Sequence, residues 1–155
     1  MARESNTVAG TKVVLKYHEP PDARKPPPSQ QWRLYVFKGE DVAQTVLLYT
    51  RSCWLIGREA AVADILVEHP SASGQHAVVQ FRHKKKKMKV QGEFGDESKE
   101  VDVVRPYLID LESANGTELN GQRIEPARYV EIRDKDMVKI GGSEREYVFM
   151  LPPKE

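Results

Sequence analysis

The chain is divided into about ten short runs of β-prone residues, and glycine, asparagine or aspartate stands between most of them. The run at 32–37 alternates, which places Trp32, Leu34 and Val36 on one face. The alanine-containing stretch 58–64 is too short to be a stable helix alone. This pattern predicts an all-β fold, an antiparallel β-sandwich. Its expected strands lie at 32–37, 45–50, 54–56, 65–67, 76–82, 107–111, 117–119, 130–132, 137–140 and 147–151.

Length and charge set limits on the class of protein. With 155 residues the chain can form one domain with its own core and with tails. The 24 basic and 23 acidic residues nearly cancel, so no global field attracts it to nucleic acid or membrane. Cys53 is the single cysteine, which excludes a disulfide within the chain and a thiolate metal site and indicates a reducing compartment. Without a long apolar run or a hydrophobic signal at 1–10, we expect neither secretion nor membrane spanning.

The chain is expected to have three parts. Residues 1–31 form an extended, proline-rich arm, because prolines at 26–28 remove backbone donors and favour extended chain. Those prolines are either a spacer or a ligand for a partner, and residues 12–25 could instead dock on the domain as an ordered brace. The domain itself occupies 32–151, and 152–155 form a C-terminal tail.

Residues 84–104 differ in composition from the rest and are expected to be a charged loop insertion. The basic run is Lys84, Lys85, Lys86, Lys87 and Lys89, and the acidic run is Glu93, Asp96, Glu97, Glu100 and Asp102. Opposite charges on two arms favour a long exposed hairpin or a mobile loop. The segment is either a solvated insertion or a nucleic-acid patch or localisation signal. The basic run has no aromatic residue nearby for base stacking, which disfavours sequence-specific RNA reading.

Three polar loops follow β-prone runs and carry the most chemistry. They are Gly57 with Arg58, then 73–76, and then 115–117. They form one site only if a β fold gathers them at one end. A guanidinium, a hydroxyl and an amide together are a good receptor for a phosphate on a peptide and a poor active site.

The ordered set Gly-Arg, Ser-x-x-His, Asn-Gly-Thr and Leu-Asn-Gly, with its strands, resembles a forkhead-associated (FHA) domain over about 32–151. This resemblance implies an eleven-stranded β-sandwich whose loops at one end bind phosphothreonine peptides. Stretches at 13–24, 69–71, 75–78, 106–111 and 123–126 resemble the branch that includes the Smad nuclear-interacting protein and the pre-mRNA leakage protein. That branch implies a nuclear subunit of the pre-mRNA retention and splicing (RES) complex of the spliceosome. It also implies an RNA-recognition-motif protein as partner, contacted by a longer N-terminal region than the 31 residues before Trp32 here.

The same resemblance implies roles for individual residues. Arg58 would donate a bidentate pair of hydrogen bonds to phosphate oxygens, Ser73 would donate to a third oxygen, and Asn115 would clamp the peptide backbone. His76 would anchor the loop that carries Ser73 rather than touch the ligand. The expected phosphopeptide-binding set is Arg58, Ser73, Gly74 and Asn115, and the expected loop-structuring set is Gly57, His76, Gly116, Thr117, Asn120 and Gly121.

Two positions depart from the family pattern. Gly74 stands where many members have a basic or amide residue, and Ala114 stands where many have threonine or serine. Each hydrogen bond lost to a charged group costs about 1.5–3 kcal/mol, so the sequence predicts a weak phosphate reader unless other cations compensate. Arg51, Arg82 or Lys84 could do so if a loop delivered them.

Catalysis is not expected. The four histidines form no ligand pattern, and there is no P-loop, nucleophile elbow or paired-carboxylate motif. Asp110 and Glu112 flank one strand end, where a solvated turn would explain them. We therefore expect no catalytic residue, metal or cofactor. The alternatives to phosphopeptide reading are a phosphate-independent scaffold in the same assembly and weak direct RNA contact through the lysine run.

Overall fold

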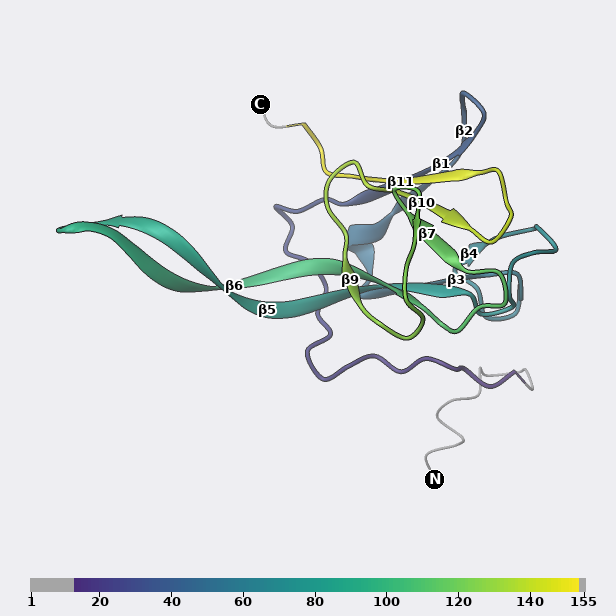
Figure 1. Ribbon diagram of the computed structural model, residues 1–155, viewed down its shortest axis with the longest axis horizontal. Coiled ribbons are helices and arrows are strands. Elements are labelled where there is room, and N and C mark those ends of the chain that lie inside the picture. Colours follow the sequence, from purple (N-terminus) through teal and green to yellow (C-terminus); the bar gives the residue numbers. More distant parts are fainter. Residues whose placement is uncertain (1–12, 154–155) are drawn as a thin grey trace.

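The computed structural model describes residues 13–153, which form two packed β-sheets (Figure 1). The six-stranded sheet has the order β2-β1-β11-β10-β7-β8, and the five-stranded sheet has the order β4-β3-β5-β6-β9. The strands are β1 (Arg33–Lys38), β2 (Asp41–Leu47), β3 (Cys53–Gly57), β4 (Ile65–Leu66), β5 (Ala77–Gly92), β6 (Gly95–Asp110), β7 (Thr117–Leu119), β8 (Gln122–Arg123), β9 (Val130–Glu131), β10 (Met137–Ile140) and β11 (Glu146–Met150). Strand pairing is antiparallel except for the short β3–β4 pair, which is parallel. The predicted sandwich of about eleven strands is confirmed.

Alternation along the strands builds the core between the sheets. Trp32, Leu34 and Val36 are all buried, as the alternating run predicts, and Leu34 is fully inaccessible. Fully burying a side chain of this size contributes about 1.5–3 kcal/mol. Both sheets contribute further large side chains to this core, including Ile56, Phe81, Leu108, Val138, Ile140, Tyr147 and Phe149.

The predicted strand at 45–50 is partly wrong. β2 begins earlier, at Asp41, and ends at Leu47, and the 3-10 turn η2 (Leu48–Thr50) follows it. The turn directs Leu48 into the core, where it is fully buried. The indole of Trp54 donates a 3.0 Å hydrogen bond to the Leu48 carbonyl, which satisfies both buried groups.

The described part of the N-terminal arm docks on the outer face of the five-stranded sheet. Leu15 and Tyr17 pack against a small apolar cluster formed by Leu55, Val78 and Ile109. Residues 13–25 therefore form the brace that was one of the two alternatives for the arm. The expectation that 1–10 contain no hydrophobic signal concerns residues outside the described part of the chain, which excludes 1–12 and the last two residues of the tail.

Residues 84–104 form a paired hairpin, the first of the two structures expected for this insertion. β5 and β6 pair in unbroken register to Gly92 opposite Gly95, and the hairpin projects away from the sandwich (Figure 1). Lys85 lies opposite Asp102 and Lys87 opposite Glu100, so opposite charges meet across the two strands. Across the described residues, no helix has the length and apolar character that a membrane crossing requires.

Candidate functional site

The fold brings the three predicted loops together at the end of the sandwich away from the β5–β6 hairpin (Figure 1). The Arg58 backbone N–H donates to the Ser73 carbonyl at 3.0 Å. The Ala114 N–H donates to the Ser73 hydroxyl at 3.1 Å, and the Asn115 side-chain amide donates to the Ser71 carbonyl at 2.8 Å. Segments that are far apart in sequence are thus bonded directly to one another.

Gly57 lets two of these loops approach closely. A Cβ atom at this position would lie 2.0 Å from the Gly74 carbonyl oxygen, which is a main-chain atom that cannot rotate away. That oxygen accepts a 3.1 Å hydrogen bond from the Glu59 N–H. Gly74 itself has room for a side chain, because a Cβ there would meet only the Glu59 Cβ at 3.4 Å.

Among the residues that the structure describes, the three predicted ligand residues keep unused hydrogen-bonding groups. Arg58 is exposed, and its Nε donates to the Ala72 carbonyl at 2.9 Å, which fixes the plane of the guanidinium and leaves the Nη groups for an external acceptor. The Ser73 hydroxyl accepts from Ala114, so its own proton remains available. Asn115 is also exposed, and its Oδ1 remains an acceptor while its Nδ2 is held by Ser71. Together these groups can hold an anion next to a peptide N–H.

His76 links two of the loops from inside the protein. It is fully buried, and its Nδ1 accepts a 3.0 Å hydrogen bond from the Ser73 N–H. The ring proton must therefore be on Nε2, which donates to the Gly116 carbonyl at 2.8 Å. Gly116 has a φ of +83°, a conformation that favours glycine. With both nitrogens engaged inside the protein, His76 has no group left for a ligand.

Burial lowers the pKa of His76, although the Gly116 carbonyl and the Asp110 carboxylate oppose that shift. Below an ordinary histidine pKa of about 6.5, the unfolded chain takes up a proton that the folded protein resists. We therefore expect the free energy of unfolding to fall as the pH drops from 7 to 5, by at most about 1.4 kcal/mol per pH unit from this group. Denaturant titrations at several pH values should show that the free energy of unfolding depends less steeply on pH in His76→Gln than in the wild type. An unchanged slope in His76→Gln would contradict the assignment.

Asp110 corrects one expectation from the sequence. The expected solvated turn is wrong for this residue, because Asp110 is buried and only 1% exposed. Its Oδ1 accepts from the Ser113 hydroxyl at 2.6 Å and the Thr117 hydroxyl at 2.7 Å, and its Oδ2 accepts from the Ser113 N–H at 3.0 Å. Burial alone would raise the pKa of Asp110, but these hydrogen bonds to the carboxylate outweigh it and lower the pKa. The carboxylate shapes the whole turn that carries Asn115.

A fourth loop, between β10 and β11, completes the cluster and was missed by sequence reasoning. The Gly141 N–H donates to the Gly116 carbonyl at 2.9 Å, and the Gly142 N–H donates to the Ser71 hydroxyl at 2.7 Å. Gly141 has a φ of +54°. The Gly141, Gly142 pair between two apolar runs was the available turn signal.

Asn120 and Gly121 lie at the far end of β7 from this cluster. Both have positive φ, at +50° and +84°, as a tight two-residue turn between β7 and β8 requires. The Asn120 side chain accepts from the Met137 N–H and donates to Asp136, both at 2.9 Å. These residues therefore hold the turn before β10.

None of the three cations suggested as substitutes reaches the loops. Arg82 makes two hydrogen bonds with Asp22, at 2.8 and 2.9 Å, and Lys84 lies 3.1 Å from the same carboxylate. Arg51 pairs with Asp64 at 2.9 Å. The loops therefore receive none of the three cations that could have compensated, because all three are bound to acidic residues elsewhere.

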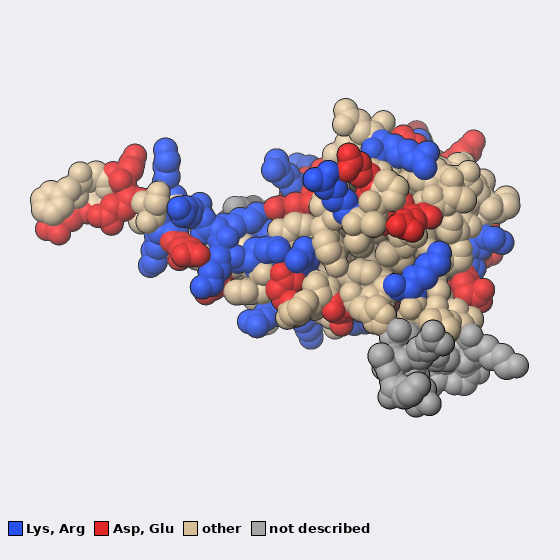
Figure 2. Space-filling view, turned by 60° about the horizontal axis from the view of Figure 1, so that its bottom comes forward, with Lys and Arg blue, Asp and Glu red and all other residues tan. Residues whose placement is uncertain are grey.

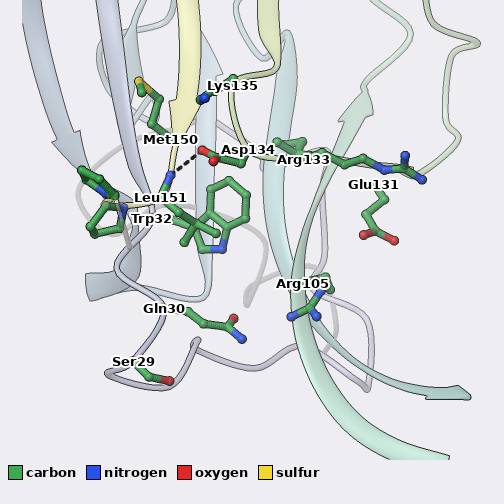
Figure 3. A pocket seen from close by; sticks show the side chains of 13 residues that line it. Ser29, Gln30, Trp32, Arg105, Glu131, Arg133, Asp134, Lys135, Met150 and Leu151 are labelled. Carbon is green, nitrogen blue, oxygen red and sulfur yellow. Dashed lines mark hydrogen bonds between the residues drawn. The ribbon is translucent and has the colours of Figure 1, made fainter. Parts of the chain in front are cut away.

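The lysine run and a surface hollow both lie apart from the loop cluster. The lysines occupy the middle of the hairpin, and acidic residues reach its tip (Figure 2). Lys86 also pairs with Glu131 at 2.7 Å. A hollow of about 810 Å³ is lined by Arg105, Arg133 and Lys135 among others, and it contains none of the predicted site residues (Figure 3). Within residues 13–153, no group of three His, Cys, Asp or Glu side chains could hold a metal ion.

Comparison with known families agrees with this geometry. The family model described as the FHA domain matches residues 54–141, which is more than half of the chain. This chain belongs to the FHA domain family. The match begins within β3 and ends just after β10, so it includes all three loops.

Individual relatives and solved structures agree with the family. The FHA domain-containing protein DDL of Arabidopsis thaliana is 46% identical over 151 residues, which are 97% of this chain and 45% of that protein. Smad nuclear-interacting protein 1 of Mus musculus is 45% identical over 97% of this chain and 36% of its own length. This FHA chain thus spans less than half the length of these relatives. The crystal structure of full-length yeast Pml1p superposes with a TM-score of 0.70 and 30% identity, over 88% of this chain and 99% of that one.

Proposed function

We propose that this FHA domain is a non-catalytic interaction module that binds phosphothreonine peptides at the cluster of Arg58, Ser73 and Asn115. The observation that carries the proposal is the arrangement of the exposed Arg58 side chain. Its Nε is anchored on the Ala72 carbonyl, and its Nη groups are unpaired among the described residues. A planar fork held in this way matches two phosphate oxygens. The Ser73 proton and the Asn115 carbonyl oxygen supply the remaining contacts.

We further propose that the module works in the nucleus in pre-mRNA splicing. One relative is called Smad nuclear-interacting protein 1, and another, 30% identical over 96% of this chain, is pre-mRNA leakage protein 1 of Saccharomyces cerevisiae. A solved structure of yeast Pml1 describes it as a splicing factor integrated into the RES complex. The expected partners are a phosphorylated protein and splicing-complex subunits, including an RNA-recognition-motif protein.

A phosphate-independent scaffold is the second candidate, and the two missing side chains support it. Neither Gly74 nor Ala114 has a side-chain donor for a phosphate oxygen. Direct RNA contact is less favoured, because Lys85 and Lys87 face acidic residues across the hairpin and Lys84 and Lys86 pair with Asp22 and Glu131.

Binding of an oriented phosphothreonine peptide library tests the proposal, with the same library unphosphorylated in parallel. Selective retention of the phosphorylated library supports phosphopeptide reading, and the enriched flanking residues define the sequence preference. Equal retention of both libraries would favour the scaffold. Binding of a labelled single-stranded RNA with a steep salt dependence would favour the lysine run.

Restoring the two missing side chains should strengthen binding. We expect Gly74→Lys and Ala114→Thr each to lower the Kd for a selected phosphopeptide about tenfold, the lower end of what one added hydrogen bond to a charged group contributes. Gly74 has the room for a side chain, and Ala114 is exposed. Isothermal titration calorimetry measures the change. Gly74→Ala is the matched control and should leave the Kd unchanged. A Gly74→Lys variant no tighter than Gly74→Ala would show that this position does not face the phosphate.

A further inference from the structure

Gln75 differs from its neighbours in the Ser73 loop because its side chain is bonded to the N-terminal arm. Its Oε1 accepts a 2.8 Å hydrogen bond from the Lys16 N–H, and its Nε2 donates to the Val14 carbonyl at 2.9 Å. Both partners are main-chain groups, so the amide pairs with the arm as a neighbouring strand would. Gln75 is only 7% exposed in this arrangement. Leaving such a buried amide without hydrogen-bond partners would be unfavourable, so this arrangement favours the docked arm.

The arm is anchored on the sheet at points well away from this loop. The Tyr17 hydroxyl lies 2.8 Å from the Gln80 side-chain oxygen and 2.7 Å from the Tyr129 hydroxyl. Further along, Asp22 pairs with Arg82, and the Arg24 N–H donates to the Phe81 carbonyl at 3.1 Å. In Figure 1 the purple arm starts near the loop end of the sandwich and runs beside β5 toward the hairpin. One docked segment therefore connects the outer sheet face to the Ser73 loop.

Residues of the neighbouring loops also hold the main chain of the Ser73 loop. The Ser73 N–H is bound by His76, and the Ser73 carbonyl is bound by Arg58. Gln75 lies between Ser73 and the buried His76, and it holds the loop from the outer side. A loop fixed on both sides has less conformational freedom to lose when it binds a ligand.

We propose that the arm belongs to the phosphopeptide site, with Gln75 as the positioning residue through which residues 13–17 hold the Ser73 loop in its binding conformation. This inference rests on the proposed function. Docking of the arm and binding of the phosphopeptide then strengthen each other by the same factor, because coupling between two binding equilibria is reciprocal. A protein that captures the arm would release the phosphopeptide, and a bound phosphopeptide would hold the arm on the sheet.

Two substitutions disturb the arm from opposite ends. Gln75→Glu keeps the size and the acceptor but presents a carboxylate oxygen to the Val14 carbonyl, where a donor is needed. Tyr17→Ala removes the anchor on Gln80 and Tyr129 without altering any residue of the loop cluster. Each should raise the Kd for a selected phosphothreonine peptide about fivefold, and the double variant should be no weaker than either alone. Gln44→Glu is the control, because it makes the same change at an exposed position of β2. It should bind as the wild type does.

Hydrogen exchange of the Lys16 amide distinguishes coupling to the ligand from a purely structural role of the arm, because only coupling makes the exchange rate depend on the phosphopeptide. Saturation of the wild type with phosphopeptide should slow this exchange about fivefold, and the unphosphorylated peptide should leave it unchanged. The inference would be overturned if Gln75→Glu and Tyr17→Ala both bound the phosphopeptide with wild-type affinity. It would also be overturned if the phosphopeptide left Lys16 exchange unchanged. Phosphopeptide reading would stand in either case. If the wild type binds the phosphorylated and the unphosphorylated peptide equally, phosphopeptide binding itself is contradicted. That result differs from one in which binding is selective but independent of the arm. Melting temperatures verify that each variant is folded.

Discussion

Replacing Arg58 with alanine should weaken binding of a selected phosphothreonine peptide at least about 100-fold. The substitution removes two charge-assisted hydrogen bonds, each worth about 1.5–3 kcal/mol. The side chain is exposed and makes one hydrogen bond within residues 13–153, so the melting temperature should change little. Isothermal titration calorimetry with the phosphorylated and unphosphorylated forms of one peptide measures the loss.

Two further variants sharpen this result. Arg58→Lys keeps the charge but loses the planar fork, so it should recover only a small part of the affinity. Arg133→Ala removes an exposed arginine beside the hollow of Figure 3, at the other end of the molecule, and should bind as the wild type does. Full affinity in Arg58→Ala would contradict the assignment of this residue to the phosphate.

Replacing Asp110 with alanine should lower the free energy of unfolding by about 3–5 kcal/mol, the largest stability effect we expect in this protein. The substitution leaves the Ser113 N–H, the Ser113 hydroxyl and the Thr117 hydroxyl without their buried acceptor. Phosphopeptide affinity should fall as well, because the turn that carries Asn115 is built on this carboxylate. Urea unfolding followed by tryptophan fluorescence gives the first quantity and calorimetry the second.

Glu112→Gln is the matched control for Asp110, since Glu112 is an exposed carboxylate two residues away. It should change the free energy of unfolding by less than about 0.5 kcal/mol, as surface substitutions usually do. The contribution of Asp110 is also expected to depend on pH. Because the pKa of Asp110 is lower in the folded protein, its stabilisation is present above the ordinary aspartate pKa of about 3.9 and is lost as the pH falls through the folded value. An Asp110→Ala variant as stable as Glu112→Gln would contradict this account.

Most of the fold could be predicted because alternation is a local property of the sequence. The strand at 32–37 shows its buried face directly, and Trp32, Leu34 and Val36 occupy the core. The error at 45–50 has a tertiary cause. β-Prone residues continue past Leu47, but the core takes Leu48 and the indole of Trp54 caps its carbonyl, which makes the chain turn. No local pattern reports such a contact.

The candidate site was less predictable than the fold, since its loops depend on contacts between distant residues. The Gly-Arg and Asn-Gly patterns identify exposed side chains, but no sequence pattern identifies the buried groups that hold these loops in place. Asp110 resembles any aspartate at the end of a strand, and its hydrogen bonds depend on Ser113 and Thr117 turning back toward it. The partners of Gln75 lie about 60 residues away in the arm. Its position two residues after Ser73 was visible in the sequence, whereas its contacts were not.

The most direct test of the central claim is an NMR titration of the whole chain with one library-selected peptide, in its phosphothreonine and its threonine forms. The account predicts that the phosphorylated form shifts the amides of Arg58, Ser73, Gly74 and Asn115 most strongly. The threonine form should shift them little at the same concentration. Equal shifts with both forms, or shifts centred on the hairpin or on the hollow of Figure 3, would contradict phosphopeptide reading by this loop cluster.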